Sequence, residues 1–431
     1  MSEVRITQEA ASEKRRAEPR RTIRGRPAGP KWLAALFADA FASAPATVGV
    51  EEELLLVDPD SLLPVDAIEV VLPLVEGDEC FAPELRASQV ELRTPVCSTV
   101  ADACHELSGA RRRLLAHLGG RFRLMAVGTH PSTAGPIAIT ARERYQRIAR
   151  EWCWAARRGQ PSGLHVHVGV ADPDEALAVY NAARSFLPEL AALAANSPFF
   201  EGEDSGLAST RLKLTEDMSR SGMPPAFGSW RELAEFAVWA RSGDTAGDLS
   251  YLWWDLRPRP EYGTIEFRVA DTQLSTADSG AIAAVCQTLV AALADRRRQG
   301  RRLPTHDNLR LNENRWRAIR DGLEGKLIDP DSGHLEPTRE RIARLLGELQ
   351  AHADALGCAH ELAHAWTMLD GNGAIRQREV FAEHGIDGLL DHLARATDEQ
   401  ADVELTAMGR DSQPRAKADL VDSTAIVETL A

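Results

Sequence analysis

Five short segments of the chain carry apolar residues at alternating positions, a pattern typical of β-strands. In such a strand one face packs against a core, and the residues in between point to the other side. We predict strands at Ala46–Val57, Ser88–Pro95, Phe122–Gly128, Gly163–Val170 and Thr264–Ala270. Together these strands would form the sheet of the fold.

Segments between the predicted strands have the features of amphipathic helices. Asp172 followed by Pro173 is a good helix start, because aspartate caps free backbone N–H groups and proline suits the first turn. After Pro337, leucine and isoleucine recur with the spacing i, i+3, i+4, i+7, which predicts a second helix. Its apolar face consists of Ile342, Leu345, Leu346 and Leu349.

Helices that alternate with strands usually indicate a parallel sheet. However, none of the predicted strands leads into a glycine-rich phosphate-binding loop of either common type. We therefore consider the parallel sheet the weaker of the two interpretations and leave an antiparallel sheet open.

Three of the predicted strands carry two polar side chains on one face, two residues apart. The pairs are Glu51 with Glu53, His165 with His167, and Glu266 with Arg268. A fourth strand carries Glu91, and Glu84 lies seven residues before it. One charged strand face is normally a solvated face. Several of them in one sheet would form a floor rich in carboxylates.

Clustered carboxylates repel one another unless a cation binds between them. The hard divalent ions Mg²⁺ and Mn²⁺ prefer oxygen ligands, with an occasional imidazole. Mg²⁺ often links such carboxylates to the phosphates of a nucleotide. The carboxylate floor therefore predicts a site for ATP and Mg²⁺ (or Mn²⁺) that needs no phosphate-binding loop.

Arginines near these strands are candidates for binding phosphate or a substrate carboxylate, because the planar guanidinium can bond both with two parallel hydrogen bonds. They are Arg211, Arg220, Arg257 and Arg268. For each of them taken alone, a surface or structural role is the favoured interpretation. Arg268 is the exception among the four, since it shares a strand face with Glu266.

Length and composition narrow the class of protein. The chain has 431 residues, of which 44% are hydrophobic and 26% charged, as in a globular protein of one elaborated domain or two. Its formal net charge of −14 disfavours a nucleic-acid-binding surface. The sequence shows neither an apolar signal segment nor an uninterrupted apolar run long enough to span a bilayer, so we expect a cytoplasmic protein without a membrane partner. Six cysteines without CxxC spacing predict free thiols.

Several segments together resemble one family of enzymes. They include VGVEEELLLVD, SGLHVHVGV, LAANSPFFEGEDSGLASTR and WWDLRPRPEYGTIEFRVAD, and the resemblance runs in order over about residues 46–390. The chain resembles the YbdK-type carboxylate-amine ligases, also called glutamate-cysteine ligase type 2. This resemblance implies a glutamine-synthetase-like α+β fold, in which a largely antiparallel curved β-sheet forms a funnel and helices pack on its outer face. It thus favours the antiparallel sheet.

The resemblance also implies roles for individual residues. The implied metal ligands are Glu51, Glu53, Glu84, Glu91, His165 and Glu266. Glu266 and Arg268 would be catalytic, with Arg268 against the transferred phosphate. We place four further residues at the part of the funnel that binds ATP or the amino acid, namely Arg257, Arg211, Asn196 and His167. For His167, a position behind the metal ligands is the alternative.

Two expectations concern single glutamates. Glu52 points away from the floor and should be buried in a hydrogen-bonded environment or lie at the rim. Replacing Glu266 by Gln should abolish ATP turnover with little change in the fold, because the exchange removes one charge from a repulsive acidic cluster.

The activity implied by the resemblance is ATP-dependent formation of a γ-glutamyl amide bond through an acyl phosphate, with L-glutamate and L-cysteine as substrates. Ser162, Ser132 and Thr210 depart from residues that are common in the family, which leaves the amine open: another amino acid, a polyamine or a peptide is the alternative. A two-metal hydrolase that needs no ATP and a non-catalytic ligand-binding protein also remain as alternatives. A homo-oligomer is compatible with each of them.

The ends of the chain differ from its middle in composition. We expect residues 1–31, which are rich in Lys and Arg, to form a disordered basic tail. An arm that contacts nucleic acid or a membrane is the alternative for this segment. Residues 32–410 would form a single catalytic ligase domain, and residues 411–431 a loose C-terminal tail.

Overall fold

A computed structural model of the chain describes residues 44–133, 136–242 and 249–407. The segments 1–31 and 411–431, for which we predict tails, lie outside the described residues. The domain limits at residues 32 and 410 therefore stay predictions.

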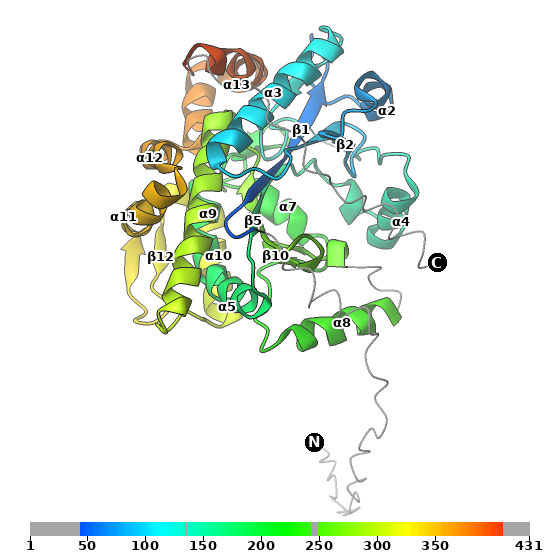
Figure 1. Ribbon diagram of the computed structural model, residues 1–431. Coiled ribbons are helices and arrows are strands. Elements are labelled where there is room, and N and C mark those ends of the chain that lie inside the picture. Colours follow the sequence, from blue (N-terminus) through cyan, green and yellow to red (C-terminus); the bar gives the residue numbers. More distant parts are fainter. Residues whose placement is uncertain (1–43, 134–135, 243–248, 408–431) are drawn as a thin grey trace, which may run out of the picture.

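Seven strands of the described chain form one antiparallel sheet at the centre of the molecule (Figure 1). The strand order is β10-β11-β5-β1-β3-β2, and β4 also pairs with β1. The strands are β1 (Val48–Val57), β2 (Phe81–Pro83), β3 (Gln89–Arg93), β4 (Arg123–Met125), β5 (Gly163–Gly169), β10 (Leu256–Arg259) and β11 (Thr264–Asp271). All five predicted strands are thereby confirmed, and the antiparallel interpretation is correct. The strands β2 and β10, which the pattern did not predict, form the two ends of the strand order.

Three two-stranded sheets lie outside the main sheet. They pair β6 (Phe199–Phe200) with β7 (Glu203–Asp204), β8 (Ser221–Gly222) with β9 (Trp253–Trp254), and β12 (Lys326–Ile328) with β13 (Leu335–Pro337).

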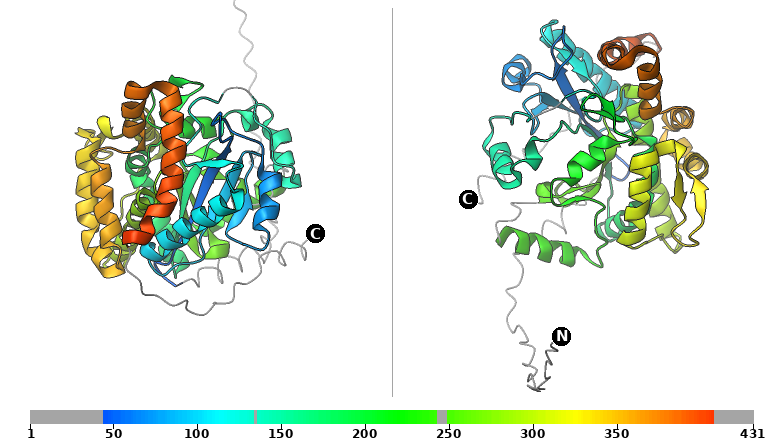
Figure 2. Two further views of the ribbon diagram at one scale, coloured as in Figure 1. Left: turned by 90° about the horizontal axis from the view of Figure 1, so that it is seen from above. Right: turned by 180° about the vertical axis from the view of Figure 1, so that it is seen from behind.

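Three helices cover the apolar face of the main sheet: α3 (Val100–Leu118), α5 (Pro173–Ala183) and α9 (Thr276–Arg298) (Figure 1). Their buried residues belong to the same core cluster as the apolar residues of β1, β5 and β11, among them Val50 and Phe267. The helices α11 (Thr338–Leu356) and α12 (Ala359–Met368) pack against α9, and they lie beside α13 (Gly373–Ala407) on one side of the molecule (Figure 2).

The remaining helices connect these layers. They are α2 (Ile68–Val71), α4 (Glu143–Trp152), α6 (Leu187–Leu193), α7 (Thr210–Glu216), α8 (Trp230–Ser242), α10 (Asn308–Asp321) and α13 (Gly373–Ala407). The last of them is kinked at Gly385, whose positive φ of 66° suits a residue without Cβ.

Both predicted helix starts are confirmed. The Asp172 carboxylate caps α5 by accepting a hydrogen bond of 2.7 Å from the backbone N–H of Glu175. Helix α11 begins directly after Pro337, and its predicted apolar face is buried. All six cysteines are free thiols, as their spacing predicts.

Helix α9 has the length and apolar composition of a membrane span, the only such case in the part of the chain that the structure describes. However, 89% of its most apolar 18-residue window is buried inside the protein. A helix that packs on the sheet and on four other helices needs this apolar surface for the core, so its composition is explained without a bilayer.

A buried ion pair joins the sheet to these helices. Glu52 of β1 points to the apolar face and is fully buried. Its carboxylate accepts hydrogen bonds from Nε and Nη2 of Arg111 on α3, at 2.7 and 2.6 Å, and from the hydroxyl of Ser279 on α9, at 2.9 Å. The expectation of a hydrogen-bonded environment for Glu52 is therefore confirmed. This pair leaves the opposite sheet face to the remaining acids.

Candidate active site

The polar strand faces lie on one side of the sheet because of the strand register. Glu51 of β1 is the cross-strand partner of His165 on β5. On the next pair of strands, His167 of β5 lies opposite Glu266 of β11. On the other side of β1, Glu53 lies opposite Glu91 of β3. Because directly opposite residues share a face, antiparallel pairing brings these side chains together.

The polar floor lines a cavity of about 350 Å³. Its lining includes five of the six predicted metal ligands, Glu51, Glu53, Glu84, Glu91 and His165, together with Arg268. The sixth, Glu266, is fully buried beside it. Glu84 reaches the cavity from the loop that follows β2. The sequence pattern did not predict β2 as a strand.

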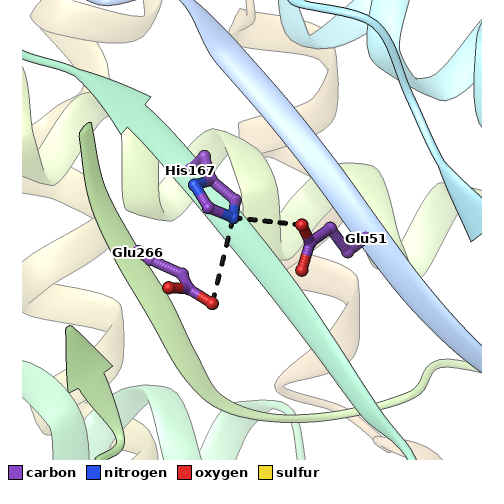
Figure 3. Close-up of side chains that lie close together, drawn as sticks. All are labelled: Glu51, His167 and Glu266. Carbon is purple, nitrogen blue, oxygen red and sulfur yellow. Dashed lines mark ion pairs between the residues drawn. The ribbon is translucent and has the colours of Figure 1, made fainter. Parts of the chain in front are cut away.

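Two groups of side chains are close enough to share a metal ion, and both contain Glu51. One group is Glu51, His167 and Glu266, and the other is Glu51, Glu91 and His165. Figure 3 shows the first group, which comes from three neighbouring strands: His167 Nε2 lies 3.4 Å from Glu51 Oε1 and 3.9 Å from Glu266 Oε1. His167, which we predicted to bind a cofactor, therefore lies with the candidate metal ligands.

The two imidazoles fit a divalent metal ion. The Nε2 atoms of His165 and His167 are buried and have no hydrogen-bond partner within the described residues. The opposite nitrogen of each ring is held, since His167 Nδ1 lies 3.0 Å from the Thr264 hydroxyl and His165 Nδ1 lies 3.1 Å from Glu51. A ring fixed at one nitrogen and open at the other, next to carboxylates, is typical of a metal-ligating histidine.

The acids on the β1–β3 side of the cavity are crowded and buried. Burial and the neighbouring Glu84 raise the pKa of Glu53 to about 7. Burial also raises the pKa of Glu84, and burial together with Glu51 and Glu84 raises that of Glu91 well above its usual value. Burial and Arg268 lower the pKa of His165 to about 3, so that its ring is neutral and able to bind a metal. This side of the cavity carries an excess of acid that a cation would relieve.

Around Glu266 the balance of charge is reversed, because positively charged side chains predominate there. Its carboxylate accepts hydrogen bonds from Arg257, Arg259 and Arg268. Burial by itself would raise the pKa of Glu266, but these three arginines lower it well below its usual value. The group is therefore ionised and enclosed by positive charge, which differs from the repulsive acidic cluster that we expected for this residue.

Arg257 is occupied by protein groups. Its Nε and Nη2 bond Glu266 at 2.7 and 2.8 Å, and its Nη1 bonds the carbonyl oxygens of Ser250 and Leu252 at 3.1 and 3.2 Å. The side chain lines the cavity, but it positions Glu266. The structure thus shows Arg257 holding Glu266 in place, and cofactor binding by Arg257 stays a prediction.

Arg211 braces the strand that carries Arg268. The pairing of β11 with β5 shifts between Phe267 and Ala270, as at a β-bulge. The Nη atoms of Arg211 donate to the carbonyl oxygens of Arg268 and Val269 within this irregularity, at 3.1 and 3.4 Å. Its Nε has no hydrogen-bond partner among the described residues, and its side chain lines the cavity. Binding of ATP or an amino acid by Arg211 stays a prediction.

Asn196 does not lie at the cavity. Its Nδ2 donates to the Thr272 carbonyl oxygen at 2.7 Å, and its Oδ1 accepts from Gln377 at 2.7 Å. With both ends of the amide bonded and 1% of the residue exposed, the side chain has no group left for a ligand. This geometry gives no support to the prediction that Asn196 binds a cofactor, which stays a prediction. The sequence motif around Asn196 resembles one that lies near the site in the family, but this side chain links the segments that carry Thr272 and Gln377.

Sequence reasoning missed several residues that line the cavity. Arg259 of β10 bonds Glu266 and stacks on the ring of Tyr262. Tyr145 of α4 donates its hydroxyl to the Pro83 carbonyl oxygen at 2.7 Å. Arg86 follows Glu84 in the same loop. Arg259 had a partial signal, since it lies two residues from the candidate Arg257, but the sequence pattern did not predict the strand that places both on one face. The others reach the site through loops and helices.

Known protein sequences match most of the chain. The model of the family described as Glutamate-cysteine ligase family 2 matches residues 47–399. A protein of Rubrobacter xylanophilus with the name "Putative glutamate--cysteine ligase 2-3" is 39% identical over 364 residues, which are 83% of this chain and 98% of that protein. A Thermobifida fusca protein with the name "Putative glutamate--cysteine ligase 2" is 36% identical over 350 residues, 79% of this chain and 88% of that protein.

Solved structures of low sequence identity share the fold. A glutamate–cysteine ligase from Francisella tularensis, solved in complex with AMP, matches with a TM-score of 0.63 at 14% identity over 83% of this chain and 89% of that chain. A bifunctional glutathione synthetase from Pasteurella multocida matches with a TM-score of 0.60 at 16% identity over 86% of this chain and 54% of that chain. The predicted α+β fold class, with its largely antiparallel sheet and covering helices, is confirmed, and it is the fold of these two structures.

Proposed function

The chain belongs to glutamate–cysteine ligase family 2, and from this we propose that it is an ATP-dependent carboxylate–amine ligase that joins L-glutamate to L-cysteine through a γ-glutamyl amide bond. A ligase of this general type follows from the family. What we propose beyond this is that ATP, L-glutamate and L-cysteine are the substrates and that an acyl phosphate is the intermediate. One observation carries it: the Nε2 atoms of His165 and His167 are buried beside carboxylates without a hydrogen-bond partner among the described residues, and His165 lines one cavity together with Arg268.

The chemistry requires activation of the acid, because a carboxylate is a poor electrophile at neutral pH. The γ-carboxylate of glutamate takes the γ-phosphoryl group of ATP, which releases ADP and leaves an acyl phosphate. The amine nitrogen of cysteine then attacks the acyl carbon, the bond from this carbon to the phosphate oxygen breaks, and inorganic phosphate and one proton leave. Phosphoryl transfer of this kind is catalysed mainly by positioning and by charge stabilisation.

The residues of the cavity supply both. Arg268 lies between Glu266 and His165, with its Nη1 3.3 Å from His165 Nδ1, so its positive charge is held at the edge of the candidate metal groups. The three arginines that enclose Glu266 keep this carboxylate ionised. A fixed guanidinium stabilises charge that develops on a transferring phosphoryl group, because it needs no reorganisation at the moment of reaction.

A divalent metal ion, Mg²⁺ or Mn²⁺, would neutralise charge on the ATP phosphates. The residues that would hold it are the members of the two groups around Glu51. Glu53 and Glu84 line the same cavity and remain proposed ligands. The mixed set of carboxylate oxygens and imidazole nitrogens suits such a hard ion.

The cellular setting is part of the same proposal. We place the reaction in the cytoplasm, with small-molecule substrates only, in line with the burial of α9 within the core. A homo-oligomer remains compatible with the proposed activity.

The experiment is to measure ADP release by the full chain with Mg²⁺, L-glutamate as donor, and a panel of amines that includes L-cysteine, other amino acids, a polyamine and a short peptide. We expect release that requires donor, amine and metal together. The best amine identifies the acceptor. Hydrolysis of a peptide or amide without ATP would instead favour the two-metal hydrolase, and no turnover in any arm would contradict the ligase.

A further inference from the structure

Arg86 is a buried guanidinium that lines the cavity without a partner. The residue is 6% exposed. Its Nε is buried without a hydrogen-bond partner, and the side chain makes no hydrogen bond or ion pair within the part of the chain that the structure describes. Desolvation of such a charge is unfavourable unless a partner of opposite charge is supplied. A ligand is the natural source of this partner, since the side chain lines a cavity.

The other arginines along the cavity each have at least one hydrogen-bond partner within the protein. Arg257, Arg259 and Arg268 bond Glu266, and Arg211 bonds backbone carbonyl oxygens. At the rim, Arg144 bonds the Ser250 hydroxyl at 2.8 Å. The contrast with these residues shows that the isolation of Arg86 does not result from sparse packing, because neighbouring guanidinium groups find partners.

The position of Arg86 separates it from the arginines around Glu266. Arg86 lies between β2 and β3, whereas Arg268 is on β11 and Arg257 on β10, and β5 and β1 lie between these strands. Its backbone pairs with Ile139, a member of the small hydrophobic cluster that also includes the preceding Leu85. A ligand that touches Arg86 and Arg268 at once would therefore span the floor of the cavity.

The charge around Arg86 suits a single carboxylate. The acidic groups that act on it are Glu53 and Glu84, and neither forms an ion pair with it. These two acids repel every anion, but they oppose a polyphosphate with several negative charges more strongly than a carboxylate with one. A carboxylate with one negative charge matches the one guanidinium, which can bond both of its oxygens. An amino-acid substrate of the proposed ligase carries such a group beside its reacting atoms.

We propose that Arg86 binds the non-reacting α-carboxylate of an amino-acid substrate, and that it thereby selects α-amino acids over analogues that lack this group. The proposal rests on the proposed function. L-glutamate is a candidate, because it carries an α-carboxylate besides the γ-carboxylate that reacts in the proposed function. The same carboxylate chemistry is present in the acceptor, so the test has one arm for each.

The test compares substrates with and without the α-carboxylate, in wild type and in Arg86→Gln. The donor arm uses L-glutamate against 4-aminobutyrate, which keeps the reacting carboxylate and the amine. The acceptor arm uses L-cysteine against cysteamine. We expect the variant to lose about 100-fold in kcat/KM for the substrate with the carboxylate, mainly through KM, and to keep the activity with its analogue. The arm in which the preference disappears identifies the substrate that Arg86 binds.

Two further variants act as controls. Arg144→Gln removes the same charge from the cavity rim and should change each preference by less than about threefold. Arg86→Lys keeps the charge and should restore part of the preference. Thermal unfolding of Arg86→Gln should stay close to wild type, because no hydrogen bond within the protein is lost. Unchanged preferences in both arms, or an effect on KM for ATP alone, would overturn the assignment.

Binding measurements separate this proposal from the proposed function. Calorimetric titration of the full chain with L-glutamate, 4-aminobutyrate, L-cysteine and cysteamine requires no turnover. If no donor and amine yield ADP, the ligase fails; the Arg86 proposal still stands if an amino acid binds more tightly than its analogue and Arg86→Gln removes the difference. If wild type turns over and the variant retains both preferences, Arg86 fails alone.

Discussion

At the scale of single residues, the charge around each carboxylate decides what its removal does. Glu91 lies among other acids, whereas Glu266, on the same sheet face, lies among three arginines. From the sequence both belong to one acidic floor. The difference arises because β10, which the pattern did not predict, adds Arg257 and Arg259 beside β11.

Glu266→Gln should therefore destabilise the protein, contrary to the expectation from the sequence. It leaves three buried guanidinium groups without their shared anion, and breaking a buried pair by removing one partner costs about 3–5 kcal/mol. Urea unfolding measures this loss. Glu91→Gln is the matched control: it removes one charge from the crowded acids and should be neutral or stabilising in the absence of metal, by about 1 kcal/mol. Equal effects of the two variants would contradict this account.

Arg268→Lys tests the catalytic assignment. A lysine keeps the charge but cannot reproduce the planar fork that bonds Glu266 and faces the cavity. We expect kcat to fall by roughly 10²-fold or more, with a smaller change in KM, because the charge that Arg268 meets develops in the transition state. Steady-state kinetics with saturating ATP and glutamate provides the measurement. A kcat within about threefold of wild type would remove Arg268 from the catalytic set.

At the scale of elements, the two faces of β1 serve different purposes. Glu51 and Glu53 line the cavity, while Glu52 between them ties β1 to α3 and α9 through Arg111 and Ser279. An acidic residue on the core side of a strand is unusual. Here the Glu52 carboxylate accepts three hydrogen bonds, two from Arg111 and one from Ser279, so it joins the sheet to two helices at one point.

Arg111→Met should cost about 3–5 kcal/mol of unfolding free energy, since it leaves the Glu52 carboxylate buried and unpaired. Chemical unfolding of the full chain provides the measurement. The double variant Glu52→Leu with Arg111→Met should recover much of the loss, because apolar replacements of both partners carry no desolvation penalty. An exposed pair is the control: Arg231→Ala on α8 should change stability by about 0.5 kcal/mol or less. A double variant as unstable as the single one would show that packing, and not charge, dominates.

At the scale of the whole molecule, the cavity couples stability to pH and metal. Glu53 has a pKa of about 7 in the folded protein, above its usual value, so the folded state holds a proton that the unfolded state releases near pH 4.5. This contribution to stability is full below about pH 4.5 and is lost as the pH rises through about 7. Glu84 and Glu91 act in the same direction.

We therefore expect the melting temperature of metal-free protein to fall between about pH 5 and pH 8, and Mg²⁺ or Mn²⁺ to reduce this fall. Metal binding should raise the melting temperature more at pH 8 than at pH 5 and release protons, because the ligands must be deprotonated. Differential scanning calorimetry across this range, with and without metal, provides the measurement. Glu53→Gln should flatten the metal-free profile. A metal-independent profile would argue against a cation site among these acids.

The site could be predicted in part because strand periodicity is local. Side chains two residues apart share a strand face in any sheet. The polar pairs that begin at Glu51, His165 and Glu266 can therefore be identified from the sequence without knowing which strands are neighbours. The predicted faces do converge for this reason. Asn196 and Arg257 show the limit: a motif places them near the site, but only the surrounding groups decide whether a side chain faces the cavity or the protein.

The sequence by itself determined the strands, the helix starts and the polar face of each strand, because each depends on residues close together in the chain. It also determined the family, through motifs that follow one another in order along the chain. The tertiary structure decided what depends on distant segments. Strand order placed Arg257 and Arg259 around Glu266, and the loop between β2 and β3 left Arg86 buried in the cavity without a partner. Charge balance at a buried group is a sum over neighbours from the whole fold, and that sum is set only when the chain has folded.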